Sequence, residues 1–277
     1  MRKVLLCLIL LLRSILLVGQ ENNPDKLRKS SFYVLPTVEL YSLTWMVKGS
    51  DFSSRLRWDN NFKTGAYFGY RGLFSNKIFF SEIGILGTIS GSGRDIDKFN
   101  SGAEIESRFQ SDRSTFISLK IGTELIKKHK EKLGIALNLA KDNLKLHSNT
   151  VSDLNSRYAI RKFDIDLNYA HSFDVANMIS EIGVQSGIGY NYAIATWNKI
   201  ESLKQPKSFD HSLMIYNIGI KAAVQLSNNF SLDILFSNNS LISGKEKTFL
   251  RDGDIQKLAI QTFNNRIFSL GLKYRIL

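Results

Sequence analysis

The chain is poor in cysteine and in proline. Of its 277 residues, only Cys7 is a cysteine and only three are prolines. If residues 1–20 are removed as a leader, no cysteine remains. A disulfide framework, a thiolate nucleophile and a cysteine metal site are then excluded. Because proline cannot donate a backbone hydrogen bond to a sheet, its scarcity favours long, uninterrupted strands.

Long apolar runs are also missing after the N-terminus. Arg2 and Lys3 precede an apolar stretch at residues 4–12, which Arg13 then interrupts. This pattern predicts a secretory signal peptide over residues 1–20, followed by a single domain over residues 21–277. An uncleaved amphipathic anchor is the alternative. Since no later run reaches 18 apolar residues, a mature chain embedded in a membrane must cross it as a closed β-barrel.

Acidic residues are outnumbered by basic ones. The formal net charge is +12, and it falls to +9 without the three cations of the predicted leader. A basic exported protein favours an anionic partner such as phosphorylated lipid headgroups. Nucleic acid is excluded, because the chain leaves the cytoplasm and carries no nucleic-acid-binding motif.

Apolar and polar residues alternate over most of the chain. Residues 54–99 are predicted to form a long strand, a tight turn, a second long strand and a polar loop, and this pattern recurs to the C-terminus. We count ten strands, joined in turn by short turns and longer polar loops. The fold class is therefore predicted as all-β, a ten-stranded antiparallel transmembrane β-barrel of the bacterial outer membrane. A soluble β-sandwich is the alternative, although its strands usually have only about 5–6 residues.

The polar loop at residues 90–99 contains the sequence SGSGRDID. Its carboxylates, Asp95 and Asp97, are two residues apart. Two neighbouring carboxylates can share a proton and orient a water molecule, so this loop is a candidate catalytic element.

Residues 54–97 resemble the omptin family of outer-membrane endopeptidases. The matching residues are Ser54, Leu56, Trp58, Gly65, Gly69 and Gly84, followed by the glycine-rich loop and the Asp-x-Asp pair. The resemblance implies a ten-stranded barrel that hydrolyses peptide bonds at its extracellular mouth, with Asp95 and Asp97 as one half of the site. It also implies lipopolysaccharide as an activating lipid, held by basic residues on the barrel exterior.

The second half of the site departs from the family. Omptins carry an Asp–His pair at the end of the strand that corresponds to residues 180–196, where this chain reads ATWNKIES and offers only Glu201. Asp210 and His211 lie on the return side of the same loop and are the candidate replacement, with Glu201 as the alternative base. Adjacent residues of a strand point to opposite faces, so both can face the cleft only across a bulge.

The other histidines suit catalysis less well. His129 and His171 are predicted at the short-turn end, and His147 in an external loop. The scattered histidines predict no metal site, and we expect no cofactor besides the lipid.

Two functions are therefore expected from the sequence, with a third less favoured. The first is a surface endopeptidase that acts on a peptide or protein substrate through Asp95, Asp97, Asp210 and His211. The second is a non-catalytic barrel that acts as an adhesin or structural surface protein through its loops. A passive pore is less favoured, because a ten-stranded barrel is largely filled by its own side chains. We expect a monomer in outer-membrane lipid.

Overall fold

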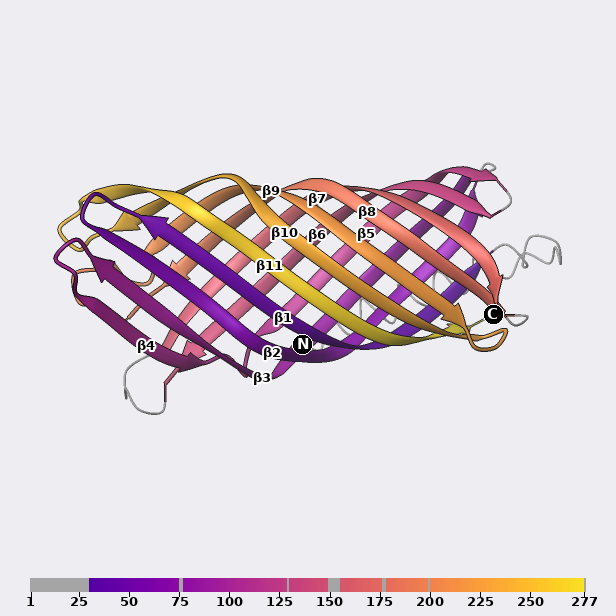
Figure 1. The fold of residues 1–277 in the computed structure, drawn as a ribbon, viewed down its shortest axis with the longest axis horizontal. Coiled ribbons are helices and arrows are strands. Elements are labelled where there is room, and N and C mark those ends of the chain that lie inside the picture. The colour runs from indigo at the N-terminus through magenta and orange to yellow at the C-terminus, as the bar shows by residue number, and fades with distance from the viewer. Residues whose placement is uncertain are drawn as a thin grey trace.

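A computed structural model of the chain describes residues 30–74, 77–128, 130–148, 155–175, 178–198 and 200–276. The predicted leader and His129 lie outside these residues. Within them the chain forms eleven strands (Figure 1). Their bounds are β1 Ser31–Lys48, β2 Phe52–Phe74, β3 Lys77–Phe99, β4 Glu104–Gln110, β5 Thr115–Lys128, β6 Glu131–His147, β7 Asn155–Val175, β8 Met178–Thr196, β9 Phe209–Gln225, β10 Phe230–Phe249 and β11 Ile255–Ile276.

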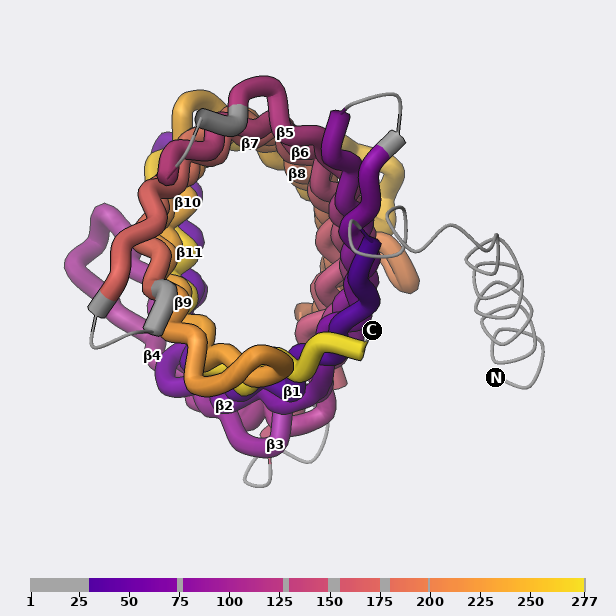
Figure 2. Tube along the Cα trace, turned by 90° about the vertical axis from the view of Figure 1, so that its right-hand side faces the viewer, coloured from indigo at the N-terminus to yellow at the C-terminus, as the bar shows by residue number. Residues whose placement is uncertain are grey.

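The strands form one antiparallel sheet that closes on itself. Each strand from β5 to β11 pairs with the next, and β11 pairs with β1, so that the sheet forms a ring (Figure 2). The predicted barrel is confirmed, and a two-sheet sandwich is excluded. The described strands number eleven rather than the predicted ten because β4 and β5 both pair with β3, one after the other along its length.

No helix among the described residues is long and apolar enough to cross a membrane.

The two ends of the barrel differ. At one end, here called the loop end, lie the connections β1–β2, β3–β4, β6–β7, β8–β9 and β10–β11. At the other, the turn end, β1 begins and β11 finishes, with Phe32 opposite Ile276. The predicted polar connection after β8 is present, since residues 197–208 separate β8 from β9.

The polar loop predicted at residues 90–99 is strand instead. β3 continues to Phe99, paired with β2 on one side and with β4 on the other. The glycines of this segment serve close packing rather than a turn. A Cβ on Gly93 would lie 2.3 Å from the backbone oxygen of Arg57 and 2.4 Å from the ring of Phe109. Likewise, most of the polar, charged segment at residues 243–257 is a hairpin of β10 and β11.

The exterior of the barrel is apolar around its circumference. Large exposed side chains on six different strands include Leu40, Ile85, Ile117, Ile165, Ile188 and Ile218. Because side chains alternate between faces, an apolar outer face leaves the other residues pointing inward. An apolar outer surface with a polar interior is typical of membrane-spanning barrels.

The interior has two layers. Toward the loop end it is filled by a cluster of buried apolar side chains, here called the apolar cluster, which includes Trp45, Leu56, Trp58, Phe109, Tyr158, Trp197, Ile215 and Phe263. Toward the turn end it is polar, with buried Glu39, Lys63, Asp142, Asp164, Asp166 and Asp233. A polar lining is thus found in the turn-end layer, and an apolar filling in the loop-end layer.

Candidate functional site

Asp95 and Asp97 lie near the loop end of β3 and point into the barrel. Asp95 is opposite Leu56 on β2, and Asp97 is opposite Ser54. Directly opposed residues share a face, and Leu56 is buried in the apolar cluster. The hydroxyl of Ser54 donates a hydrogen bond to Asp95 Oδ1 at 3.2 Å. Both carboxylates are half-buried, so they lie at the rim of the cluster.

Asp210 and His211 point to opposite faces of β9, with no bulge to bring them together. His211 is opposite Ala193 on β8 and Glu246 on β10, all three buried on the inner face. Asp210 lies on the outer face and accepts a hydrogen bond from Lys207 Nζ at 2.7 Å. The structure therefore brings His211, but not Asp210, to the predicted site.

Lys207 confirms the outward setting of Asp210. Its ammonium lies in the β8–β9 connection, outside the strands, and its hydrogen bond to Asp210 raises the pKa of Lys207 above its ordinary value. Asp210 is thus engaged in a surface ion pair.

Glu246 is a site residue that the sequence did not reveal. Its Oε2 lies 3.1 Å from His211 Nδ1, which is an ion-pair distance. Neither imidazole nitrogen makes a hydrogen bond of normal geometry with the described part of the chain. The side chains of His211 and Glu246 are only 2% and 5% exposed. The available signal is the alternation of Glu246 and Thr248 within a charged segment of the sequence.

Tyr158 of β7 connects the two halves of the site. Its ring centroid is 5.9 Å from that of His211 and 5.5 Å from that of Trp58. Its hydroxyl lies close enough to the carboxylates of Glu246, Asp95 and Asp97 to interact electrostatically with all three. Tyr158 therefore packs beside His211 and lies within electrostatic range of the carboxylates on both walls.

The remaining predicted candidates lie elsewhere. Glu201 is exposed in the β8–β9 connection. His147 Nε2 lies 3.1 Å from Asp112 Oδ1 at the end of β6. His171 is near the turn end of β7, opposite Glu131. In the described ranges no three His, Cys, Asp or Glu side chains are grouped as they would need to be to hold a metal ion.

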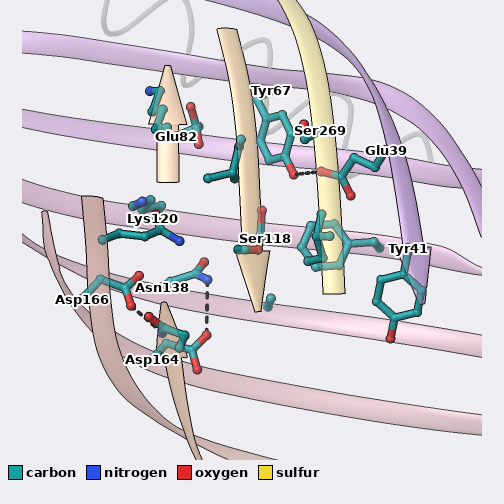
Figure 3. Close-up of a pocket in the computed structure, with 18 of the residues that line it drawn as sticks. Glu39, Tyr41, Tyr67, Glu82, Ser118, Lys120, Asn138, Asp164, Asp166 and Ser269 are labelled. Carbon is teal, nitrogen blue, oxygen red and sulfur yellow. Dashed lines mark hydrogen bonds between the residues drawn. The ribbon is translucent and has the colours of Figure 1, made fainter. Parts of the chain in front are cut away.

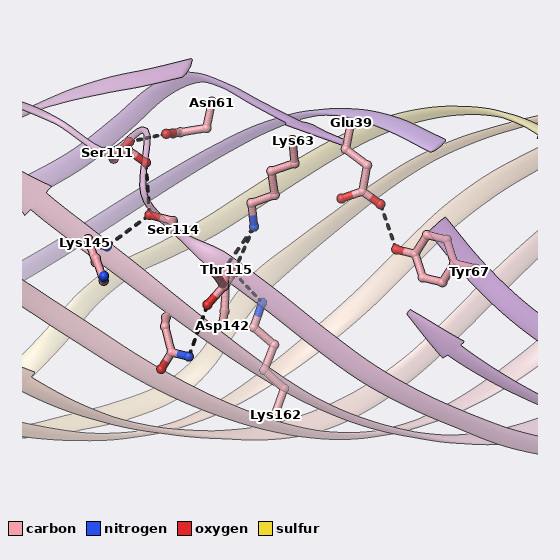
Figure 4. A network of polar contacts seen from close by, with 11 residues as sticks. Glu39, Asn61, Lys63, Tyr67, Ser111, Ser114, Thr115, Asp142, Lys145 and Lys162 are labelled. Atoms are coloured by element: carbon pink, nitrogen blue, oxygen red, sulfur yellow. Dashed lines mark hydrogen bonds and ion pairs between the residues drawn. The ribbon is translucent and has the colours of Figure 1, made fainter. Parts of the chain in front are cut away.

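In the polar layer toward the turn end lies a cavity of about 210 Å³ (Figure 3). One ion pair joins strands that are not neighbours here, and a second joins adjacent strands. Asp142 Oδ2 lies 3.2 Å from Lys63 Nζ and 3.6 Å from Lys162 Nζ. Nearby, the Tyr67 hydroxyl donates to Glu39 Oε1 at 2.8 Å (Figure 4). Since burying an ion is costly unless it is paired, these contacts hold the walls in register and make the cavity part of the barrel's framework.

A second cavity, of about 310 Å³, lies on the outer face of β1, β2 and β11. Its lining comprises Ser42, Thr44, Arg57, Asp59, Thr262, Asn264 and Arg266. Asp59 Oδ1 accepts a hydrogen bond from Arg57 Nε at 2.6 Å, and its Oδ2 lies 3.8 Å from Arg94 Nε. The groove thus carries more positive than negative charge.

Comparison with known proteins shows the fold and no more. No family model matches the chain, and no curated protein matches it. Among solved structures, the outer membrane protease OmpT from Escherichia coli is similar with a TM-score of 0.62 at 12% identity, over 89% of this chain and 97% of that one. The transport unit of the autotransporter AIDA-I from Escherichia coli gives a TM-score of 0.46 at 10% identity, over 92% and 91% of the two chains. The chain therefore has the fold of bacterial outer-membrane β-barrels.

Proposed function

We propose that this protein is an outer-membrane barrel with a peptide-hydrolysing site at its loop end. The observation that supports it is that Asp95 and Asp97 on β3 and His211 on β9 all face the barrel interior at its loop end. Two carboxylates facing a histidine are also what the resemblance to omptins implies.

The proposed reaction uses one water molecule. Asp95 and Asp97 orient the water, and His211 Nε2 removes one of its protons as the oxygen attacks the peptide carbonyl. The carbon–nitrogen bond then breaks, and the imidazolium returns the proton to the departing amine. The products are a carboxylic acid and an amine, and no other reactant is consumed.

Peptide cleavage by refolded barrel tests this proposal. The assay uses quenched-fluorescence peptides, some with paired basic residues, in the presence and absence of lipopolysaccharide. We expect cleavage that falls about 10²–10⁴-fold in Asp95→Asn and His211→Gln, the range for lost acid–base catalysis. His147→Gln is the matched control, since this second loop-end histidine contacts Asp112 instead. A wild-type rate no higher than that of His211→Gln would refute the proposal.

A non-catalytic surface barrel is the second candidate. One observation favours it: His211 is 2% exposed and Trp58 is fully buried, so the apolar cluster fills the space in which a substrate would bind. In that case the barrel folds normally, cleaves no peptide and acts through its loops. Alanine substitution of Glu201, Ser202 and Lys204, which are exposed in the β8–β9 connection, would then weaken surface binding without unfolding the barrel.

The expected lipid partner belongs to the same proposal. The outer groove with Arg57 and Arg266 suits the phosphates of lipopolysaccharide, because guanidinium groups bind phosphate by paired hydrogen bonds. The double variant Arg57→Gln/Arg266→Gln should co-purify with less lipopolysaccharide than wild type. Arg251→Gln, in the β10–β11 connection, is the control, and equal lipid content in all three proteins would count against this groove.

A further inference from the structure

We infer that Glu246 is the positioning residue for His211, in the role that the sequence had given to Asp210. This inference rests on the proposed function for its catalytic meaning, but the pairing itself has a separate test. It assigns the orienting carboxylate to the neighbouring strand β10 rather than to the strand that carries the histidine.

Both oxygens of Glu246 are engaged on the inner face. Oε1 accepts a hydrogen bond from the Thr248 hydroxyl at 3.2 Å, and Oε2 lies 3.1 Å from His211 Nδ1. Glu246 and His211 are directly opposed in the β9–β10 ladder. The register of two strands therefore sets the position of this carboxylate beside the imidazole, and Thr248 limits its rotation.

The imidazole is held by packing as well as by charge. The ring of Trp45 meets that of His211 edge-on, with centroids 4.2 Å apart. On β8 His211 is opposite Ala193, which is fully buried. With Glu246 Oε2 3.1 Å from Nδ1, the negative charge of the carboxylate favours the proton on Nδ1 and leaves Nε2 as the base.

Asp210 cannot substitute for Glu246 in this role. It points outward, toward Lys207, and strand geometry keeps it on the opposite face from His211. Glu246 is the carboxylate within ion-pair distance of His211 in the described residues.

Nitrogen NMR of barrel labelled with ¹⁵N-histidine tests the pairing without any substrate. The resonances of His211 are identified by their loss in His211→Gln. We expect the Nδ1–H form in wild type and in Glu246→Asp, and a shift toward the Nε2–H form in Glu246→Gln. Glu106→Gln on β4 is the matched control and should leave the spectrum unchanged. Heat-modifiable gel mobility confirms that each variant is folded.

The kinetic arm links the pairing to catalysis. Glu246→Gln should lower kcat by about 10²–10⁴-fold with little change in KM, as expected when a histidine is held in the wrong protonation form, and Glu246→Asp should restore part of it. A shifted NMR spectrum with an inactive wild type would support the pairing while refuting the proposed function. An unchanged tautomer in Glu246→Gln, or an unchanged kcat in an active barrel, would overturn the inference.

Discussion

Lys63 of β2 and Asp142 of β6 form an ion pair across the interior of the barrel, with Nζ and Oδ2 3.2 Å apart. The two side chains are 2% and 0% exposed. Their strands are not neighbours in the ring, because β3 and β5 lie between them. The pair therefore links two walls that no backbone hydrogen bond connects.

Removing the Asp142 carboxylate should destabilise the barrel strongly. In Asp142→Ala both Lys63 and Lys162 lose their buried partner, and an uncompensated buried charge costs about 3–5 kcal/mol. The free energy of unfolding in urea measures this loss. Asp174→Ala is the control, because its ion pair with Lys130 is exposed and is worth only about 0–1 kcal/mol. Equal effects in the two variants would contradict the buried link.

Gly65 should not tolerate a side chain. A Cβ at this position would lie 2.0 Å from the backbone oxygen of Ile85, on the paired strand β3. Overpacking of this kind costs typically about 1–3 kcal/mol, so Gly65→Ala should lower the unfolding free energy or slow refolding. Gly87→Ala is the matched control, since nothing lies within 4 Å of the Cβ that it would add. If both variants have the same unfolding free energy and refolding rate, the close approach of β2 and β3 does not exclude a side chain at Gly65.

Tyr158 should control access to His211. Its ring lies among those of Trp45, Trp58 and Trp197, with centroids 5.5–6.4 Å away. Tyr158→Ala removes this ring from the apolar cluster and should speed acylation of His211 by diethylpyrocarbonate at least several-fold, as read by peptide mass spectrometry.

The control for this experiment is Tyr190→Ala, whose ring is exposed on the outer face of β8. Acylation of His211 at the wild-type rate in both variants would show that Tyr158 does not cover the histidine.

Asp210 should be dispensable. Asp210→Asn breaks only the surface pair with Lys207, so we expect peptide cleavage within about twofold of wild type and a loss of stability of about 0–1 kcal/mol. The pKa of Lys207 is raised in the folded barrel. The pair therefore stabilises the fold fully at pH values below the ordinary lysine pKa of about 10.4. That contribution disappears as the pH rises through the higher folded value.

Urea unfolding of wild type and Asp210→Asn at pH 8 and at pH 11.5 measures this dependence. The small difference between the two proteins should be present at pH 8 and smaller at pH 11.5. A difference that grows with pH would contradict the assigned pairing.

The sequence predicted the barrel because alternation is a property of each strand alone. The strand from Phe268 to Ile276, for example, shows its lipid-facing residues without reference to any neighbour. The same alternation, together with the adjacency of Asp210 and His211, was enough to expect that only one of them could face inward. These features depend on local geometry.

The partner of His211 depended on register, which local patterns do not contain. Glu246 reaches His211 because β10 pairs with β9 at one offset among several, after an irregularity between Leu241 and Ser243. The glycine- and serine-rich segment before Asp95 was misread as a loop for a similar reason: its small residues accommodate Arg57 and Phe109 on adjoining strands. Contacts between strands therefore determine both the partner of His211 and the conformation of the segment before Asp95.

The pairing of β1 with β11 has a consequence for biogenesis. β1 and β11, the first and last strands among the described residues, share fifteen aligned residue pairs, from Phe32 with Ile276 to Lys48 with Ala259. The ring therefore cannot close until β11 has been delivered. Every partly inserted intermediate exposes two unpaired strand edges, which are templates for association with other chains. A cell that produces this barrel must shield those edges until the C-terminal strand arrives.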